Sequence, residues 1–343
     1  MHPCLSFYCP QPVVRDDSPV RLERFPRSVH ALLKDQFGPL ANLRSSAGCG
    51  VFFATDSPWI DLQLARLRHH QMASCGVAIE VQHEDGWRGV DSADLREREG
   101  DLTVRLPTGL ERGGPVRPVV CWLPLISTVA FSGLAVAEGA QVEAVAAPAP
   151  TWLALGDSLT QGFIAQSPLA AWPHRLMRAW DAPGWNLGVG GLRIEPEAVA
   201  WALAAQRWPL VIIALGSNHC WKDADVATVA PRAEALARLA LAGGHGQVVW
   251  CLPPWKPCED GKGPPEFAGV PLDRSTAARI ATVRATLREV LSSFPAITLV
   301  EDLMPHDHRV YPDGLHPTAF GLATYAAGLL PMMTSRLRDP ATP

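Results

Sequence analysis

The chain has 343 residues, of which 48% are hydrophobic and 19% charged, and its formal net charge is −4 at pH 7. This length favours two domains over one, and the composition is that of a globular protein with ample core material. The slightly acidic balance offers no basic stripe, so nucleic acid is not an expected partner. No apolar segment is long enough to span a bilayer, and no membrane partner is expected.

The N-terminal region carries neither a targeting signal nor a metal motif. Residues 1–17 lack the charged region and the continuous apolar region of a secretory signal, so we expect a cytoplasmic protein, with a signal already removed as the open alternative. Cys4 and Cys9, with His2 nearby, have no second pair to complete a zinc site. No metal is therefore predicted.

The eight cysteines are dispersed along the chain and do not form a disulfide framework. Cys251 and Cys258 flank a proline-rich loop, and a bridge between them under oxidising conditions stays open beside the simpler case of two thiols. Five cysteines lie in apolar, strand-like settings that predict buried free thiols: Cys49, Cys75, Cys121, Cys220 and Cys251.

Up to about residue 146, apolar and polar side chains alternate with a period of two. The alternating runs are 60–65, 77–82 and 102–106, and turn signals lie at 55–58, 84–86 and 108–114. Short alternating strands with regular turns predict antiparallel sheets, most simply a β-sandwich. Only residues 29–35 suggest a short helix in this half.

From about residue 151, apolar strands alternate with amphipathic helical segments. The predicted strands are 151–156, 184–189, 209–216, 247–253 and 296–302, and the predicted helices are 168–180, 195–208, 230–243, 273–294 and 317–337. This pattern predicts an α/β domain with a parallel sheet covered on both faces. An Ala/Pro linker at 143–151 divides the chain, which gives domains 1–146 and 147–343.

The first strand of the second half ends in the stretch WLALGDSLTQG, residues 152–162. In an open parallel sheet, ligands bind beyond the carboxyl ends of the strands. Gly156 permits a sharp turn there, and Ser158 begins the next helical segment. A serine in this place is either a nucleophile or a helix N-cap, and the motif alone favours the cap.

A second motif, YPDGLHPTAFG at 311–321, supplies an imidazole and a carboxylate. A Gly-Leu turn separates Asp313 from His316, and Pro317 is predicted to start the last helix directly after the histidine. A carboxylate that holds one ring nitrogen leaves the other free to take a proton from a serine. The alternative is a histidine at a helix entrance beside a turn aspartate.

Two further strands of the same half end in groups suited to binding an oxyanion. Residues 186–191 (NLGVGG) allow a backbone N–H to approach a ligand closely, and residues 214–218 (ALGSN) place an amide side chain directly after a strand. Each element alone is common in turns. The four elements together, in order and at one edge of a sheet, favour a site.

These four blocks resemble the GDSL, or SGNH, hydrolase family over about residues 150–335. The resemblance implies a three-layer, flavodoxin-like SGNH domain, preceded here by an all-β, jelly-roll-like sandwich. It also implies Ser158 as nucleophile, His316 as general base and acid, and Asp313 as the carboxylate that orients it. The backbone of Ser158, the backbone of Gly191 and the side chain of Asn218 correspond to the oxyanion hole.

Two positions depart from the family pattern. His219 follows Asn218 where an aspartate is frequent, and a glycine precedes Gly191 where many relatives have serine. His219 either tunes the pocket or bonds within its loop. Asp157 belongs to the first motif and is expected to orient the turn.

Other residues are weaker candidates for the substrate pocket. Trp221 and Trp255 follow strand ends and either line the pocket or pack in the core. Together with Asp157 and His219, they are the candidates for substrate binding. The Pro/Gly-rich insert at 253–267 is expected to overhang the site. The absence of a long apolar lid favours short acyl groups.

The predicted activity is a serine esterase that cleaves short-chain, chiefly acetyl, esters of a carbohydrate or a small alcohol through an acyl-serine, without a cofactor. An acyltransferase of natural-product tailoring would use the same triad. A catalytically inactive glycan-binding protein is the other alternative. The sequence does not indicate an oligomeric state.

Overall fold

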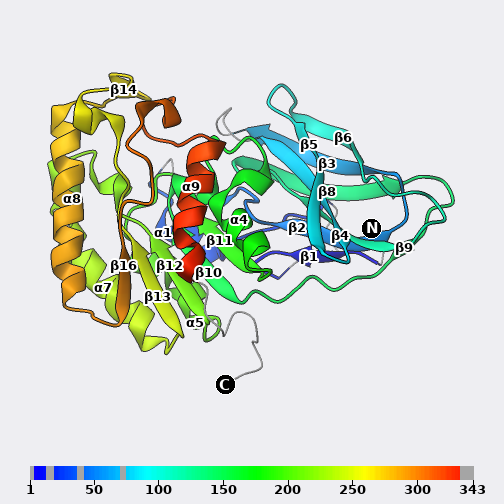
Figure 1. Ribbon diagram of the computed structural model, residues 1–343, viewed down its shortest axis with the longest axis horizontal. Helices are drawn as coiled ribbons and strands as arrows, with labels where there is room; N and C mark the ends of the chain where they lie inside the picture. The colour runs from blue at the N-terminus through cyan, green and yellow to red at the C-terminus, as the bar shows by residue number, and fades with distance from the viewer. Residues whose placement is uncertain (1–3, 13–18, 37–41, 70–74, 333–343) are drawn as a thin grey trace. The chain divides into compact units, whose positions relative to one another are not determined.

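The computed structural model describes residues 4–12, 19–36, 42–69 and 75–332 (Figure 1). The chain divides into two compact units. Unit 1 comprises Met1–Ala149 and Ala165–His174, and unit 2 comprises Pro150–Ile164 and Arg175–Pro343. Among the described residues, no helix is both long enough and apolar enough to cross a membrane.

Unit 1 contains two antiparallel sheets. The first has the strand order β1-β2-β7-β4-β5, with β9 also paired to β2, and the second has the order β6-β3-β8. The strands of the first sheet are β1 (Ser6–Tyr8), β2 (Gly50–Thr55), β4 (Gly76–His83), β5 (Gly86–Asp94), β7 (Arg117–Trp122) and β9 (Val142–Glu143). Those of the second are β3 (Trp59–His69), β6 (Gly100–Pro107) and β8 (Ser127–Val136), and α1 spans Arg27–Leu32.

The two sheets of unit 1 share one hydrophobic core, which makes this unit a β-sandwich. Ile60 and Leu62 of β3 are fully buried in the same cluster as Val77 and Ile79 of β4. Their neighbours Asp61 and Gln63 are only partly buried, because successive strand side chains point to opposite faces. The alternation read from the sequence therefore marks the inner face of each sheet.

Residues 165–174 belong to unit 1 although they follow the first strand of unit 2. The His174 ring lies 5.0 Å from the Trp122 ring, and its Nε2 lies 3.3 Å from Glu80 Oε1. Trp122 Nε1 donates a hydrogen bond of 2.6 Å to Glu80 Oε2. A buried carboxylate thus accepts a hydrogen bond from the indole and lies beside the imidazole, which places this segment against β4 and β7.

Unit 2 is built on a parallel five-stranded sheet with the order β11-β10-β12-β13-β16. This is the flavodoxin-like order: the second strand, β11, lies on one side of the first, β10, and all later strands are added on the other side. The strands are β10 (Trp152–Gly156), β11 (Gly184–Gly188), β12 (Leu210–Ala214), β13 (Gln247–Cys251) and β16 (Ile297–Val300).

Helices cover both faces of this sheet, with α7 and α8 on one side and α9 on the other in Figure 1. Trp180, directly after α4, donates a hydrogen bond to the Leu330 carbonyl, directly after α9, so these two helix ends lie together. The α-helices are α3 (Ser158–Gln161), α4 (Trp172–Ala179), α5 (Pro196–Ala204), α6 (Asp223–Val226), α7 (Val229–Ala242), α8 (Arg274–Ser292) and α9 (Ala319–Leu329).

Short elements complete unit 2 and its connections. The 3₁₀ helices are η1 (Pro168–Ala170), η2 (Ser217–His219), η3 (Pro257–Asp260), η4 (His308–Val310) and η5 (Leu330–Met332). A small hairpin, β14 (Glu266–Phe267) and β15 (Val270–Pro271), lies in the insert after β13.

Three predicted helices have wrong boundaries: the helix predicted at 195–208 ends at Ala204, and two others begin at the wrong residue. The predicted helix 168–180 is split at Ala171, whose backbone is extended, into η1 and α4. Pro173 fits only the first turn of a helix, so α4 begins at Trp172. The last helix begins at Ala319 and not at Pro317, with Thr318 as its N-cap. Residues 333–337 of that prediction lie outside the described residues.

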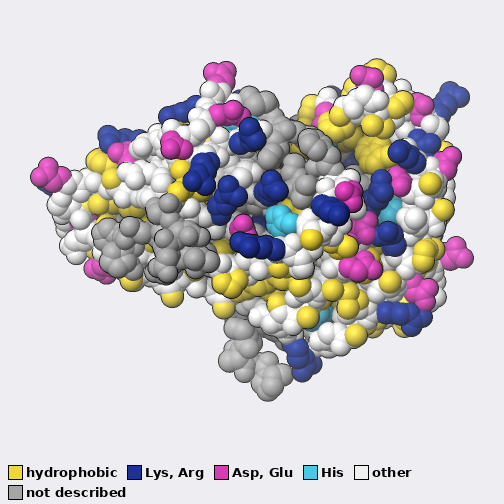
Figure 2. Space-filling model, turned by 180° about the vertical axis from the view of Figure 1, so that it is seen from behind, with side chains coloured by type: hydrophobic (Ala, Val, Ile, Leu, Met, Phe, Trp, Pro, Cys, Tyr) yellow, Lys and Arg dark blue, Asp and Glu magenta, His cyan; other side chains and the backbone are white. Residues whose placement is uncertain are grey.

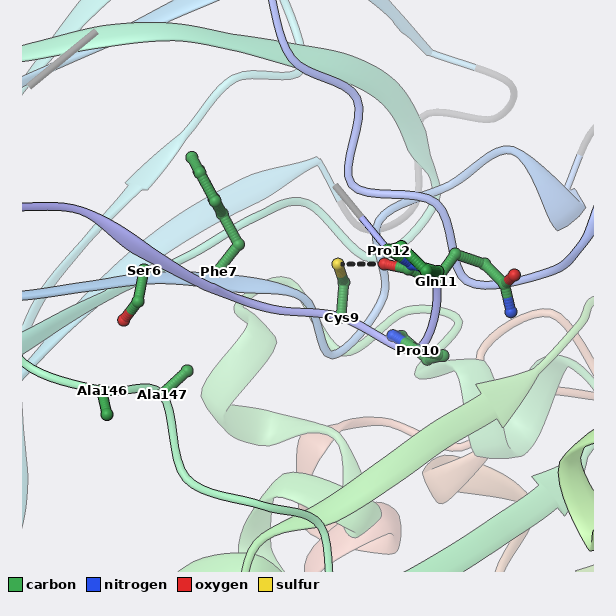
Figure 3. Close-up of a pocket in the computed structure, with 8 residues that line it drawn as sticks. All are labelled: Ser6, Phe7, Cys9, Pro10, Gln11, Pro12, Ala146 and Ala147. Carbon is green, nitrogen blue, oxygen red and sulfur yellow. Dashed lines mark hydrogen bonds between the residues drawn. The ribbon is translucent and has the colours of Figure 1, made fainter. Parts of the chain in front are cut away.

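All eight cysteines are free thiols, Cys251 and Cys258 included. Cys9 lines an open pocket of about 470 Å³ in unit 1 (Figure 3). The other lining residues are Ser6 and Phe7 of β1, residues 10–12, Ala146 and Ala147. The Cys9 thiol donates to the Gln11 carbonyl at 3.0 Å. Burial raises the pKa of Cys9 to about 12, so the thiol is neutral at physiological pH.

The surface carries charges of both signs. Figure 2 shows acidic and basic side chains interspersed with apolar ones. Four large hydrophobic side chains are exposed within the described residues, namely Leu32, Val90, Phe320 and Leu330. They come from four separate elements or loops of the chain.

Candidate active site

The carboxyl ends of three neighbouring strands meet at one edge of the parallel sheet. Gly156 of β10 pairs with Gly188 of β11 on one side and with Ala214 of β12 on the other. A Cβ atom on Gly188 would lie 2.1 Å from the backbone nitrogen of Gln161, so glycine is needed there for α3 to approach β11. The segments that follow these strands therefore emerge side by side.

Ser158 is the first residue of α3, and Asp157 caps that helix. Asp157 Oδ1 accepts a hydrogen bond of 3.0 Å from the Leu159 backbone N–H. The cap predicted as an alternative role for Ser158 is thus supplied by its neighbour. The Ser158 side chain is half-buried, and its hydroxyl is available for another partner.

That partner is His316, whose Nε2 lies 2.9 Å from Ser158 Oγ. The other ring nitrogen, Nδ1, lies 2.7 Å from Asp313 Oδ2. A carboxylate only accepts hydrogen bonds, so Nδ1 carries the proton and Nε2 is the acceptor for the serine hydroxyl. Three residues separated by up to 158 positions thus form one hydrogen-bonded chain.

The loop that carries Asp313 and His316 is fixed by the same carboxylate. Asp313 Oδ1 accepts hydrogen bonds from the backbone N–H groups of Leu315 at 2.9 Å and His316 at 2.7 Å. Gly314 has φ +80°, a conformation that glycine adopts without strain, and it makes this tight turn possible. The Asp313 side chain therefore holds both the backbone N–H and the ring of His316.

The electrostatics of the two carboxylates differ. Desolvation raises the pKa of Asp313, but the hydrogen bonds and charge of His316 and the backbone N–H groups outweigh it, so this pKa is lower than usual. Desolvation dominates at Asp157 and raises its pKa. Asp313 is therefore ionised at neutral pH and can accept the hydrogen bond from the His316 ring.

Candidate oxyanion donors lie on the two neighbouring strand ends. Asn218 Nδ2 donates one hydrogen to the Leu192 carbonyl at 3.1 Å, which joins η2 to the loop after β11. Trp221 Nε1 donates to Asn218 Oδ1 at 3.2 Å and so fixes which end of the amide is the donor. Gly191 is exposed with φ +82°, and its N–H meets no acceptor in the described part of the chain.

Aromatic rings flank the imidazole on two sides. The Phe163 ring stacks on His316 with centroids 4.1 Å apart and an interplanar angle of 30°. Phe267, from the hairpin of the insert, meets the imidazole edge-on at 5.2 Å. The insert therefore contacts the histidine, and the side chain of His316 remains only 8% exposed.

The other pocket candidates lie in different surroundings. His219 is fully buried, and its Nε2 accepts from the Ile194 N–H at 3.0 Å while Nδ1 lies 2.9 Å from the Asp225 carbonyl. Trp255 is buried, stacks on His306 and meets Tyr311 edge-on. His219 is thus bonded to the loop after β11, and Trp255 packs on residues that follow β16, whereas Trp221 is half-buried beside Asn218.

Three residues that the sequence analysis did not single out lie at this site. Phe163 and Phe267 pack on the imidazole. Lys256 is buried and donates a hydrogen bond to the Leu315 carbonyl, one residue before His316. Only Phe163 could have been found from the sequence, because it lies five residues after Ser158. Phe267 and Lys256 belong to the insert, which has no periodicity.

The described residues contain no group of three or more His, Cys, Asp or Glu side chains placed to hold a metal ion. The groups joined to Ser158 by hydrogen bonds are an imidazole and, through it, a carboxylate. These groups are suited to nucleophilic attack on a carbonyl and to proton transfer.

The fold and these contacts define an α/β protein with a Ser–His–Asp hydrogen-bond chain at the carboxyl edge of a parallel sheet. Residues 154–323 match the model of the GDSL-like lipase/acylhydrolase family. This part of the chain belongs to that family. A search of the curated proteins found no match.

Solved structures with the same fold extend over both units. A protein designated a GDSL-like lipase, from Bacteroides ovatus, is 15% identical in sequence and has a TM-score of 0.77. The matched region covers 97% of this chain and 98% of the Bacteroides protein. The salicylyl-acyltransferase SsfX3 from a tetracycline biosynthetic pathway is 17% identical with a TM-score of 0.72, covering 95% and 93%. A family two carbohydrate esterase from Clostridium thermocellum is 14% identical with a TM-score of 0.58, covering 86% and 94%.

Proposed function

We propose that this protein is a serine esterase that hydrolyses short-chain acyl esters through an acyl-serine intermediate on Ser158. The observation that carries the proposal is the continuous chain from Ser158 Oγ through the His316 ring to Asp313, with distances of 2.9 and 2.7 Å. Both distances are within hydrogen-bond reach, so a proton can pass from the hydroxyl to the imidazole.

The reaction begins when Ser158 Oγ attacks the ester carbonyl carbon as its proton moves to His316 Nε2. The new Oγ–C bond leaves a negative charge on the carbonyl oxygen, and the Asp313 carboxylate stabilises the imidazolium. When the intermediate collapses, the bond to the alcohol oxygen breaks and His316 returns the proton to that oxygen. Water then attacks the acyl-serine by the same route and releases the acid.

Three donors are proposed for the negative oxygen: the backbone N–H groups of Ser158 and Gly191 and the second Nδ2 hydrogen of Asn218. The first Nδ2 hydrogen is used by Leu192, and Trp221 fixes the amide so that Nδ2 and not Oδ1 is available. A donor held in advance acts on the charge as it develops in the transition state, where it contributes most.

We further propose a short acyl group, acetyl above all, on a carbohydrate or a small alcohol. Phe163 and Phe267 restrict the room beside the imidazole, which supports a small substrate. The overlap in fold with a carbohydrate esterase over 86% of the chain supports a sugar as the alcohol. Trp221 is the proposed pocket residue, since His219 and Trp255 are engaged elsewhere.

Acyl transfer to an alcohol other than water is the second candidate. The two aromatic rings that cover the imidazole would slow the entry of water to an acyl-serine, and this observation favours transfer. Adding an acceptor alcohol to the assay separates the two reactions. Ester in excess of free acid would identify a transferase, and free acid alone would identify an esterase.

The direct test is Ser158→Ala with p-nitrophenyl acetate as substrate. We expect the purified variant to lose activity by at least 10³-fold, because only the oxyanion donors and binding remain. The control is Ser292→Ala, which removes an exposed hydroxyl at the end of α8 and should leave the rate unchanged. Undiminished hydrolysis by Ser158→Ala would reject the proposal.

A further inference from the structure

Lys256 is a buried lysine that the reaction described above does not use. It lies between β13 and η3, at the base of the insert, and only 6% of its surface is exposed. Burying an ammonium group costs several kcal/mol unless charged and polar partners compensate. The partners of Lys256 therefore indicate why a charge is kept at this position.

The ammonium group contacts the loop that carries Asp313 and His316. Its Nζ donates a hydrogen bond to the Leu315 carbonyl, the acceptor of the peptide group that joins Leu315 to His316. The same nitrogen lies 5.2 Å from the centroid of the Tyr311 ring, a cation–π contact. Lys256 thus touches this loop both before Asp313 and immediately before His316.

The backbone of Lys256 is anchored as well. Its N–H donates to Glu259 Oε1 at 2.8 Å, and Glu259 pairs with Arg284 of α8, where both side chains are only 15% exposed. Arg284 also donates to the Pro253 carbonyl. These charged side chains therefore join the base of the insert to α8 and hold the backbone of Lys256 in place.

Several ionisable groups surround the ammonium. Burial lowers the pKa of Lys256, and the carboxylates of Asp157 and Asp313, which attract the ammonium, oppose this shift. The thiols of Cys220 and Cys258 also face it. Burial raises the pKa of both thiols, to about 12 for Cys220, so they are neutral at pH 7. The lysine is consequently the counter-charge of two carboxylates that adjoin Ser158 and His316.

We infer that Lys256 is a positioning residue for the acid–base pair: it holds the peptide that precedes His316 and balances the negative charge of Asp157 and Asp313. The inference rests on the proposed function. Without the ammonium, the imidazolium would face two carboxylates with no opposing charge. This excess of negative charge around the acid–base pair should move the acidic limb of the activity to higher pH.

The test compares Lys256→Met, which removes both the charge and the donor, with Lys256→Arg, which keeps both. For Lys256→Met we expect kcat to fall about 10- to 100-fold with KM changed less than threefold. The acidic limb of its kcat/KM profile should move up by about 0.5 to 1 pH unit. Lys256→Arg should keep the wild-type limb. The control is Lys262→Met, at an exposed lysine of the same insert.

Melting temperatures of all variants separate this role from a purely structural one, which would lower stability without moving the limb. A Lys256→Met profile that superimposes on that of the wild type, with kcat within threefold, would overturn the inference. If Lys256→Met does not fold, Lys256→Gln takes its place, since it keeps a donor and loses the charge. Labelling of wild-type Ser158 by a fluorophosphonate reports on the proposed function independently of these variants.

Discussion

The first prediction concerns Asn218, whose two hydrogen bonds fix the orientation of its side-chain amide. Asn218→Ala removes the amide while leaving Ser158, His316 and Asp313 in place. Loss of one preorganised oxyanion donor costs about 10²–10³ in kcat, or about 2.7–4 kcal/mol. KM should stay nearly unchanged, because the donor acts chiefly on the charge that develops in the transition state.

A second variant tests how the amide is oriented. Trp221→Phe keeps an aromatic ring but removes the indole N–H that donates to Asn218 Oδ1 at 3.2 Å. A neutral hydrogen bond contributes about 1 kcal/mol, so we expect kcat to fall about fivefold. Because Trp221 acts through Asn218, the double variant should be no slower than Asn218→Ala alone.

The assay is the initial rate of p-nitrophenyl acetate hydrolysis as a function of substrate concentration, on variants with wild-type melting temperatures. Trp201→Phe is the matched control, since that indole donates to the Ala198 carbonyl within α5 and away from Asn218. A kcat for Asn218→Ala within tenfold of the wild type would refute the oxyanion role. Additive losses in the double variant would refute the link through Trp221.

Three further predictions concern the triad and its support. Asp313→Asn should lower kcat about 10⁴-fold in the same ester assay, and a loss below tenfold would contradict its orienting role. Because the folded pKa of Asp313 is lowered, its stabilising contribution is present above about pH 4, the unfolded pKa, and is lost as pH falls through the folded pKa. Urea melts at several pH values should show this slope in the wild type and a smaller one in Asp313→Asn. Gly188→Ala would place a Cβ atom 2.1 Å from the Gln161 nitrogen. It should destabilise the protein by about 3 kcal/mol, and an unchanged urea midpoint would contradict this packing.

The sequence could predict that Ser158, His316 and Asp313 meet in one hydrogen-bond chain, because each of them lies next to a strong local signal. Ser158 follows an apolar strand that ends in glycine, and Asp313 and His316 lie three residues apart before a proline. The alternation of strands and helices then implies one sheet edge where these segments meet. Both the parallel sheet and the β-sandwich were predicted correctly from periodicity alone.

The surroundings of the triad could not be predicted in the same way. Lys256 and Phe267 belong to an insert whose Pro- and Gly-rich sequence has no periodicity, so nothing local indicates which of its side chains turn inward. Their positions depend on nonlocal contacts with Leu315 and His316. The first turn of α9 was misplaced for a related reason, since the Asp313 carboxylate organises the chain before it.

The central claim is that the Ser158 hydroxyl is activated as a nucleophile. The most direct measurement is the mass of the wild-type protein after reaction with a fluorophosphonate, followed by identification of the modified peptide. The account predicts a single adduct on Ser158 that is absent from Ser158→Ala and strongly slowed in His316→Ala. An unmodified protein, or an adduct on another residue, would contradict it.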